Sequence, residues 1–158
     1  MIKEILKYPN PILKKKSEEV KEITAGIKQL CFDMIKIIKE NNGVGLAAPQ
    51  IGVLKRIITI YTGDKPAVFI NPKITKKSRN KEINEEGCLS FPKLFLKIKR
   101  AKTIEAEAIN MEGKPIQIKA DNLAARIFQH EVDHLDGILI IDKVGPVKRW
   151  KLKKKIKK

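Results

Sequence analysis

Both histidines of this 158-residue chain lie in one short segment, His130-Glu131-Val132-Asp133-His134. Residues four apart lie on one face of an α-helix, about one turn from each other, so both imidazoles can reach a single metal ion. Glu131 follows the first histidine and is placed to take the proton of a water bound to that metal. The alternative is a helix whose two ordinary histidines match a short pattern by chance. The segment therefore predicts a metal-binding helix, which the rest of the chain has to support.

A catalytic metal of this kind usually has three protein ligands and one open position, so a third ligand is required. Ile140 occupies the position at which an extended metalloprotease motif has its third histidine. No glutamate follows Glu131, which excludes the arrangement with a glutamate on a later helix. The third ligand must come from upstream, or be one of the downstream aspartates Asp133, Asp136 and Asp142.

The two cysteines are the upstream candidates. Cys31 falls in a predicted helix at 24–41, where apolar residues recur at helical spacing, and we expect it in the core. Cys88 instead follows Gly87 in a short segment with polar flanks. Taken alone, Cys88 is explained equally well as a small loop residue that binds no metal. A thiolate and two imidazoles suit a divalent transition metal, so the two histidines favour Cys88 as the third ligand.

A third segment, Gly43-Val44-Gly45-Leu46-Ala47-Ala48-Pro49-Gln50, follows the predicted helix. Its small residues permit the close approach of a ligand or another strand. Its glycine spacing excludes a dinucleotide or phosphate loop. The side-chain amide of Gln50 is able to donate a hydrogen bond to a carbonyl oxygen. On its own, the segment predicts a plain turn.

Together the three segments resemble peptide deformylase. That family carries a glycine-rich segment ending in glutamine, then Glu-Gly-Cys-Leu-Ser, then Gln-His-Glu-x-Asp-His-Leu. Here these are residues 43–50, 86–90 and 129–135, in the same order. Residues 8–13 also look like the family's amino-terminal pattern, so the resemblance runs to about Pro146. One departure is Asn42, where relatives often carry an acidic residue, and we expect it to affect local hydrogen bonding only.

The resemblance implies a role for each of these residues. The metal ligands would be Cys88, His130 and His134, with a water in the fourth position. Glu131 would take the proton of that water and deliver it to the leaving amine. The charge on the former formyl oxygen would be met by the metal, the Gln50 amide and the Leu89 backbone N–H. The implied substrates are nascent chains that begin with N-formylmethionine, and the released product is formate.

A pocket for the first side chain of the substrate is expected beside the metal. Leu123 and Ile127 precede His130 by seven and three residues and share its helix stripe. They predict an apolar pocket for an unbranched side chain such as methionine, and simple core packing is the compatible alternative. We expect the peptide to pair, like an added strand, with the backbone of Val44, Gly45 and Gly87.

The ligand types allow zinc, iron, cobalt or nickel. The resemblance implies one divalent ion per chain, natively Fe²⁺, with Zn²⁺ giving a less active form and Ni²⁺ or Co²⁺ as further substitutes. An iron–thiolate site would be sensitive to air.

The length predicts one catalytic domain at 1–147, with an α+β fold of mostly antiparallel strands packed around a central metal-binding helix. We expect strands near 56–61, 67–70 and 94–99, a hairpin of 102–110 and 115–119, and a helix cap at Asp121 or Asn122. The chain has two cysteines, no apolar run of membrane-spanning length and no secretion signal. We therefore expect a cytoplasmic monomer.

The formal net charge is +16, and residues 148–158 hold eight of the 34 basic side chains and no acid. We expect a basic tail or helix end there. One interpretation is a solvated segment of a lysine-rich chain, and the other is contact with RNA. The resemblance gives the second a purpose, because related enzymes carry a carboxy-terminal helix that docks on the ribosome.

Two other functions are compatible with parts of this sequence. A basic RNA-binding protein without catalysis would suit the composition, but it leaves both histidines, Cys88 and Gln50 unexplained and lacks a recognised RNA-binding signature. A metalloprotease acting on internal peptide bonds is disfavoured by the missing downstream ligand.

Overall fold

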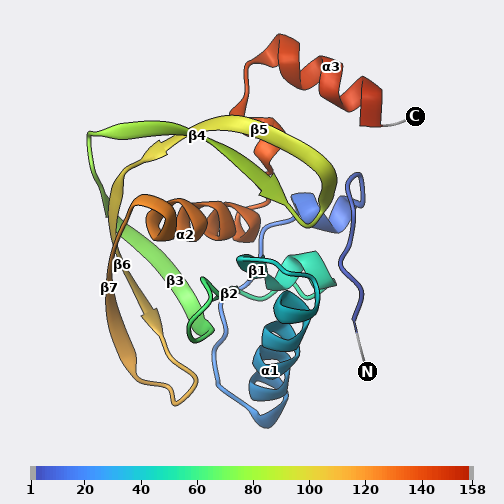
Figure 1. Ribbon diagram of the computed structural model, residues 1–158. Helices are drawn as coiled ribbons and strands as arrows, with labels where there is room; N and C mark the ends of the chain where they lie inside the picture. Colours follow the sequence, from blue (N-terminus) through green and yellow to red (C-terminus); the bar gives the residue numbers. More distant parts are fainter. Residues whose placement is uncertain (1–2, 157–158) are drawn as a thin grey trace.

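Helix α2 (Asn122–Leu135) runs through the middle of the molecule between two antiparallel sheets, as Figure 1 shows. This computed structural model describes residues 3–156. The strands are β1 (Gly45–Ala47), β2 (Ile57–Ile60), β3 (Ala67–Lys77), β4 (Lys81–Cys88), β5 (Phe91–Ala101), β6 (Thr103–Ile109) and β7 (Pro115–Asp121). The larger sheet has the order β1-β2-β3-β6-β7, and β4 and β5 form the smaller one. The expected α+β fold is confirmed.

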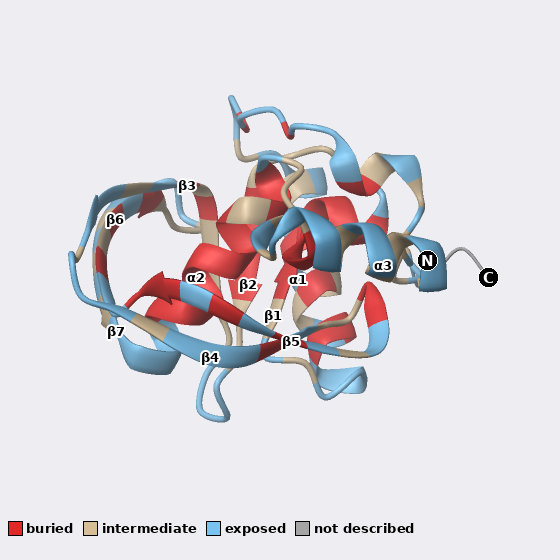
Figure 2. Cartoon of the chain, turned by 90° about the horizontal axis from the view of Figure 1, so that it is seen from above, coloured by how far each residue is buried: buried red, intermediate tan, exposed pale blue. Residues whose placement is uncertain are grey.

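Helix α2 is buried along most of its length, with residues 125–132 all shielded from solvent (Figure 2). Polar side chains on such a helix must find partners inside the protein. Gln129 does so with the backbone of Ala101: its Nε2 donates to the carbonyl at 2.9 Å, and its Oε1 accepts from the N–H at 3.2 Å. Asp121 occupies the N-cap position, but its side chain makes no capping hydrogen bond.

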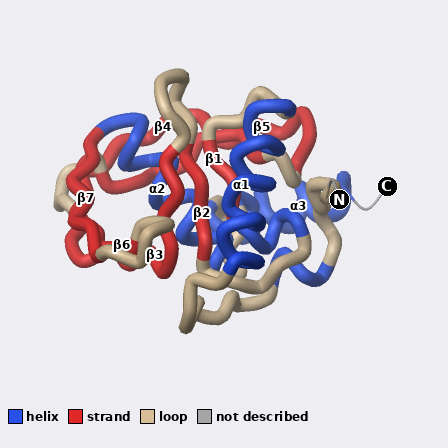
Figure 3. Tube along the Cα trace, turned by 90° about the horizontal axis from the view of Figure 1, so that it is seen from below, coloured by secondary structure: helices blue, strands red, loops and turns tan. Residues whose placement is uncertain are grey.

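Strand β2 separates two apolar clusters because its side chains alternate between the faces of the sheet. Ile57 packs in the cluster around α1 (Ala25–Glu40), whereas Ile58 packs in the cluster around α2. Phe128 of α2 meets Phe69 of β3 edge to face, with 5.3 Å between ring centroids. Figure 3 shows α1 beside β1 and β2. Strand β1, which carries part of the glycine-rich segment, therefore lies between α1 and α2.

Helix α1 agrees with the helix predicted at 24–41. The hydroxyl of Thr24 caps it by accepting from the Ile27 N–H at 3.2 Å. It ends at Glu40 with Asn41 as its C-cap, and the next residue, Asn42, lies in the left-handed region with φ 53°. Cys31 is fully buried in the α1 cluster, as expected of a core residue.

Three segments are more regular than the sequence predicted. Strand β3 continues to Lys77, beyond the strand predicted at 67–70. Strand β4 forms where the polar residues around Cys88 suggested a loop, and its Glu85 pairs with Lys97 of β5. The segment 43–50 is not a plain turn, since it forms β1 and then a 3₁₀ helix (Ala48–Ile51). Two further 3₁₀ helices of the described residues lie at Pro11–Lys14 and Ile140–Lys143.

The basic carboxy-terminal segment forms helix α3 (Pro146–Ile156), which begins before residue 148, and residues 157–158 lie outside the described part. Leu152 and Ile156 pack against a third apolar cluster, which includes Leu13 and Phe91. Trp150 is 62% exposed on the other side. Within residues 3–156, every helix is too short or too polar to cross a membrane.

Candidate active site

The three predicted metal ligands meet in space. Cys88 ends β4, whereas His130 and His134 lie one turn apart on α2, and their ligand atoms all lie within 4.8 Å of one another. The Sγ of Cys88 is 3.3 Å from Nε2 of His134, and the two imidazole centroids are 5.1 Å apart. One sulfur and two nitrogens form a donor set that suits a divalent transition metal.

A buried polar atom supports this fit. Within the described residues, Oε1 of Glu131 is buried beside the cluster and makes no hydrogen bond. Such groups are rare in folded proteins unless a ligand, ion or water completes them. The Glu131 carboxylate beside the cluster therefore has a free acceptor for the proton of a water molecule.

Glu131 is almost fully buried on α2. Burial raises the pKa of its carboxyl to about 7, although the positive charges of His130 and Arg100 oppose the rise. A carboxyl that titrates near neutral pH can both accept and release a proton under working conditions. The residue next to the ligands is thus suited to proton transfer.

His130 is oriented by a carboxylate that the sequence analysis did not assign. Its Nδ1 is 2.9 Å from Oε1 of Glu86, so its Nε2 is left as the nitrogen that can bind a metal together with Cys88 and His134. Arg100 binds Glu86 through two nitrogens, at 2.7 and 2.9 Å, and Arg126 binds it at 2.5 Å. Arg100 also reaches Asp133 at 2.6 Å. These four charged residues link β4, β5 and α2.

The surroundings of Glu86 keep it ionised. Burial alone would raise the pKa of this carboxyl, but His130 and Arg100 outweigh burial and lower the pKa to about 2. A signal for this network was present in the sequence, because Arg126 lies on the same helix as the histidines amid otherwise apolar positions. Its partner Glu86 begins the segment 86–90 but is 40 residues away, and nothing local in the sequence connects it to Arg126.

Gln50 is held with its amide nitrogen toward the cluster. Its Oε1 accepts from the Ala47 N–H at 2.9 Å, which fixes the orientation of the amide. Its Nε2 lies 3.6 Å from the Cys88 sulfur and donates to Ser90 Oγ at 3.1 Å. The donor predicted from sequence is therefore beside the proposed ligand, and Ser90 is a partner that sequence reasoning missed.

The amino-terminal segment fastens these two parts of the site together. The N–H of Leu6 donates to the carbonyl of Gln50 at 2.7 Å, and that of Tyr8 donates to the carbonyl of Ser90 at 3.0 Å. Lys7 Nζ donates to the Leu89 carbonyl at 3.0 Å. Three consecutive residues thus hold the back of the site.

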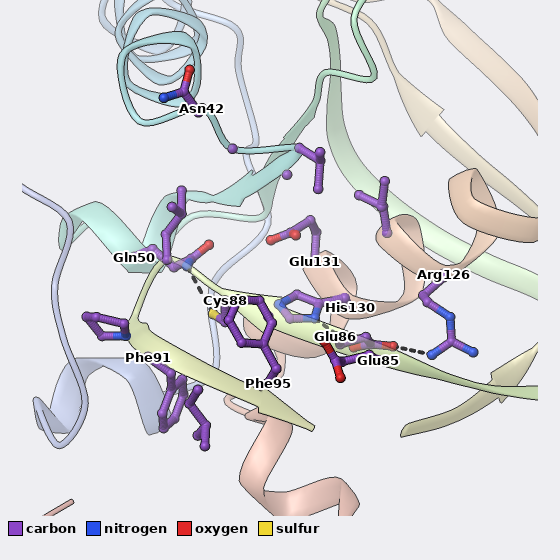
Figure 4. A pocket seen from close by; sticks show the side chains of 18 of the residues that line it. Asn42, Gln50, Glu85, Glu86, Cys88, Phe91, Phe95, Arg126, His130 and Glu131 are labelled. Atoms are coloured by element: carbon purple, nitrogen blue, oxygen red, sulfur yellow. Dashed lines mark hydrogen bonds and ion pairs between the residues drawn. The ribbon is translucent and has the colours of Figure 1, made fainter. Parts of the chain in front are cut away.

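A cavity of about 500 Å³ opens beside the cluster (Figure 4). Its lining includes all the expected substrate-contacting residues and the expected N–H donor, namely Val44, Gly45, Gly87, Leu89, Leu123 and Ile127. His130 and Glu131 also line the cavity, whereas His134 is 1% exposed and is not part of its lining. Phe95 and Arg126, which the sequence analysis did not assign, complete the wall.

Comparison with known proteins agrees with this geometry. The family profile described as Polypeptide deformylase matches residues 2–150. A peptide deformylase of Thermodesulfovibrio yellowstonii is 46% identical over 161 residues, covering 99% of this chain and 97% of that protein. The crystal structure of peptide deformylase from Thermotoga maritima superposes with a TM-score of 0.89 at 38% identity, covering 92% of this chain and 99% of that one.

A peptide deformylase from Synechococcus elongatus, solved in complex with actinonin, has a TM-score of 0.91 at 33% identity and covers 97% of this chain. That alignment includes 85% of the Synechococcus chain. Sequence profile, relatives and solved structures thus agree over nearly the whole length. The chain belongs to the peptide deformylase family.

Proposed function

We propose that the Cys88–His130–His134 cluster and its adjoining cavity form the active site at which this chain carries out the deformylase reaction. The family's enzymes are metal-dependent hydrolases, and this chain accordingly removes the N-formyl group from the amino terminus of nascent polypeptides. The observation that carries the assignment is the meeting of segments 43–50, 86–90 and 129–135 beside one cavity, with Gln50 against the Cys88–His130–His134 cluster.

A divalent metal bound at the cluster would polarise the formyl carbonyl and make a water molecule more acidic. Glu131 takes the proton that this water loses as its oxygen bonds to the formyl carbon. When the carbon–nitrogen bond breaks, Glu131 delivers the proton to the departing amine. Glu131 thus carries one proton of the water to the nitrogen. The other proton remains on the formic acid, which ionises to formate as the free amino terminus becomes protonated. Burial of Glu131, which raises the pKa of its carboxyl, favours release of the proton to the amine.

The oxygen of the former carbonyl gains negative charge during attack. The Gln50 amide is directed to the Cys88 side of the site by its bonds to Ala47 and Ser90, and it donates to this oxygen. The backbone N–H of Leu89, next in the chain after Cys88, is the second proposed donor. Donors already held in place stabilise the developing charge without having to reorganise.

The first side chain of the substrate fits the apolar part of the cavity. Leu123 and Ile127 lie one helical turn apart and both line it, which suits an unbranched methionine side chain. The peptide backbone follows the edge at Val44 and Gly45 and the facing residue Gly87 as an added strand. Actinonin, present in the Synechococcus elongatus structure, is a probe for the same cavity here.

The native ion in this proposal is Fe²⁺, one per chain, with Zn²⁺, Ni²⁺ or Co²⁺ as possible replacements in purified protein. The sulfur and nitrogen ligands accept all four. We further propose that the enzyme is a monomer and that it works in the cytoplasm, where formylated chains are made.

Helix α3 is proposed as a contact to ribosomal RNA. Leu152 and Ile156 hold the helix on the protein, while Lys151, Lys154 and Lys155 are exposed. Trp150 is also exposed, and Lys154 Nζ lies 5.1 Å from its ring centroid. A row of cations beside an exposed aromatic ring favours a polyanion with bases to stack.

The decisive experiment measures formate release from a short formyl-methionyl peptide by anaerobically purified protein whose metal is quantified. Wild type should be active, and Glu131→Gln should lose activity while holding about one metal per chain. Metal without formate release, even after reconstitution with iron, would contradict the assignment. Hydrolysis of unformylated peptides would instead favour a protease.

A further inference from the structure

Glu86 is a buried carboxylate shared by three cationic or hydrogen-bonding groups. Arg100 approaches both of its oxygens, and Arg126 binds Oε2 at 2.5 Å. Oε1 also meets Nδ1 of His130 at 2.9 Å. The orientation of this carboxylate therefore determines where the His130 ring can point.

The two arginines differ in the partners that they bind. Arg100 divides its guanidinium between Glu86 and Asp133, which it reaches at 2.6 Å. Arg126 makes its ion pair to Glu86, and its other hydrogen bonds go to backbone carbonyls, of Ile98 at 2.8 Å and Glu82 at 2.7 Å. Asp133 is also paired with Lys143, at 3.6 Å, so Arg126 is the arginine whose only carboxylate partner is Glu86.

Arg126 also ties together the two elements that carry the proposed metal ligands. Its own backbone belongs to α2, which bears His130, and its guanidinium binds carbonyls on both β4 and β5. Cys88 ends β4. The same side chain therefore fixes the hairpin relative to the helix and fixes the carboxylate between them. Its side chain is 8% exposed and forms part of the cavity wall (Figure 4).

We propose that Arg126 is a positioning residue of the active site, which acts through Glu86 to hold the His130 imidazole in the orientation that binds metal. This inference rests on the proposed ligation by His130. Groups that orient a metal-bound histidine change metal affinity by about 10- to 100-fold when they are removed. Arg126 does not touch His130 itself. It binds Glu86, and Glu86 in turn binds the imidazole of His130.

The test compares three arginine variants. Arg126→Met removes the guanidinium but keeps a long stem in the cavity wall. Arg126→Lys keeps the charge but cannot reach Glu86 and two strand carbonyls together. Arg56→Met is the matched control, because Arg56 also fastens α2, through Asp136 at 3.0 Å and the Leu135 carbonyl at 3.2 Å, without touching Glu86.

Metal affinity is measured on the folded proteins by competition of a chelator for Co²⁺ or Zn²⁺, alongside kcat and KM for a formyl-methionyl peptide. We expect Arg126→Met to weaken metal binding about tenfold or more and to lower kcat more than it changes KM. Arg126→Lys should lie between it and wild type. Arg56→Met should lower the melting temperature and leave metal affinity within twofold of wild type.

The route through Glu86 is tested by combining variants. In a Glu86→Gln protein, Arg126→Lys should cause no further loss of metal affinity, since the carboxylate that transmits its effect is already gone. An equal additional loss would overturn this route. Unchanged metal affinity in Arg126→Lys would overturn the inference whether or not Arg126→Met folds. If wild type itself bound no metal, the failure would lie with the proposed active site instead.

Discussion

Gly45 and Glu131 approach each other so closely that no side chain fits between them. A β-carbon on Gly45 would lie 2.8 Å from Cδ of Glu131 and 2.9 Å from Cγ2 of Ile127. Gly45 is the first residue of β1, at the edge of the larger sheet, and Glu131 is buried on α2. The glycine therefore allows the proton-carrying carboxylate to lie directly against the strand that the substrate is proposed to pair with.

Gly45→Ala should reduce kcat by about 10²-fold, because the new methyl group displaces the Glu131 carboxylate and general acid–base catalysis contributes about 10²–10⁴. Metal content should stay near wild type. The control is Gly145→Ala, where an added β-carbon would meet nothing within 4 Å. Steady-state formate release together with metal analysis checks this, and full activity in Gly45→Ala would contradict it.

Glu86→Gln should destabilise the protein by about 3–5 kcal/mol, because Arg100 and Arg126 would keep buried charges without their shared partner. Glu18→Gln serves for comparison: its partner Lys55 and its own side chain are exposed, and such pairs contribute about 1 kcal/mol or less. Denaturant unfolding of metal-free protein measures both. Equal, small effects would mean that the buried network adds little stability.

Gln50→Ala should lower kcat by about 10²–10³ with a smaller change in KM, as expected for loss of one oxyanion donor. Ser90→Ala removes only an acceptor of the Gln50 amide and should cost less. The two variants are compared on the same formyl peptide. A larger loss in Ser90→Ala than in Gln50→Ala would reverse the proposed roles.

The two cysteines should differ in reactivity at pH 8. Burial raises the pKa of the fully buried Cys31 to about 11, so roughly one thiol in a thousand is ionised at that pH, and only the thiolate is nucleophilic. Cys88 lines the cavity and should be alkylated once a chelator has removed the metal. Peptide mass spectrometry after iodoacetamide treatment distinguishes the sites. Modification of Cys31 without urea would show that the α1 cluster opens readily.

Replacing Lys151, Lys154 and Lys155 of α3 by glutamine should weaken ribosome binding and flatten its dependence on salt, while activity on short peptides is unchanged. The matched control replaces Lys73, Lys76 and Lys77 of β3, which are also exposed and change the charge equally. Sedimentation with ribosomes at several salt concentrations gives both values. If the two triple variants lose binding equally, total charge accounts for the binding and α3 has no special part.

The parts of the site that sequence predicted are those with a local signal. Two histidines four residues apart need only the helical repeat to share a face, and the cap of α1 needs only Thr24 and its neighbours. The Arg126–Glu86 pair had no such signal, because it depends on how β4 docks against α2. Strand β4 was missed for a related reason: its inward residue, Glu86, is charged, so the usual alternation of apolar and polar residues is absent.

The arrangement of the ligands also bears on how this protein is made. Cys88 and His134, whose sulfur and Nε2 lie 3.3 Å apart, are separated by 46 residues of sequence. Strands β5, β6 and β7 and most of α2 must be synthesised between them. A growing chain of this enzyme therefore cannot assemble the cluster until His134 has left the ribosome, so an enzyme that acts on nascent chains is itself inactive for most of its own synthesis.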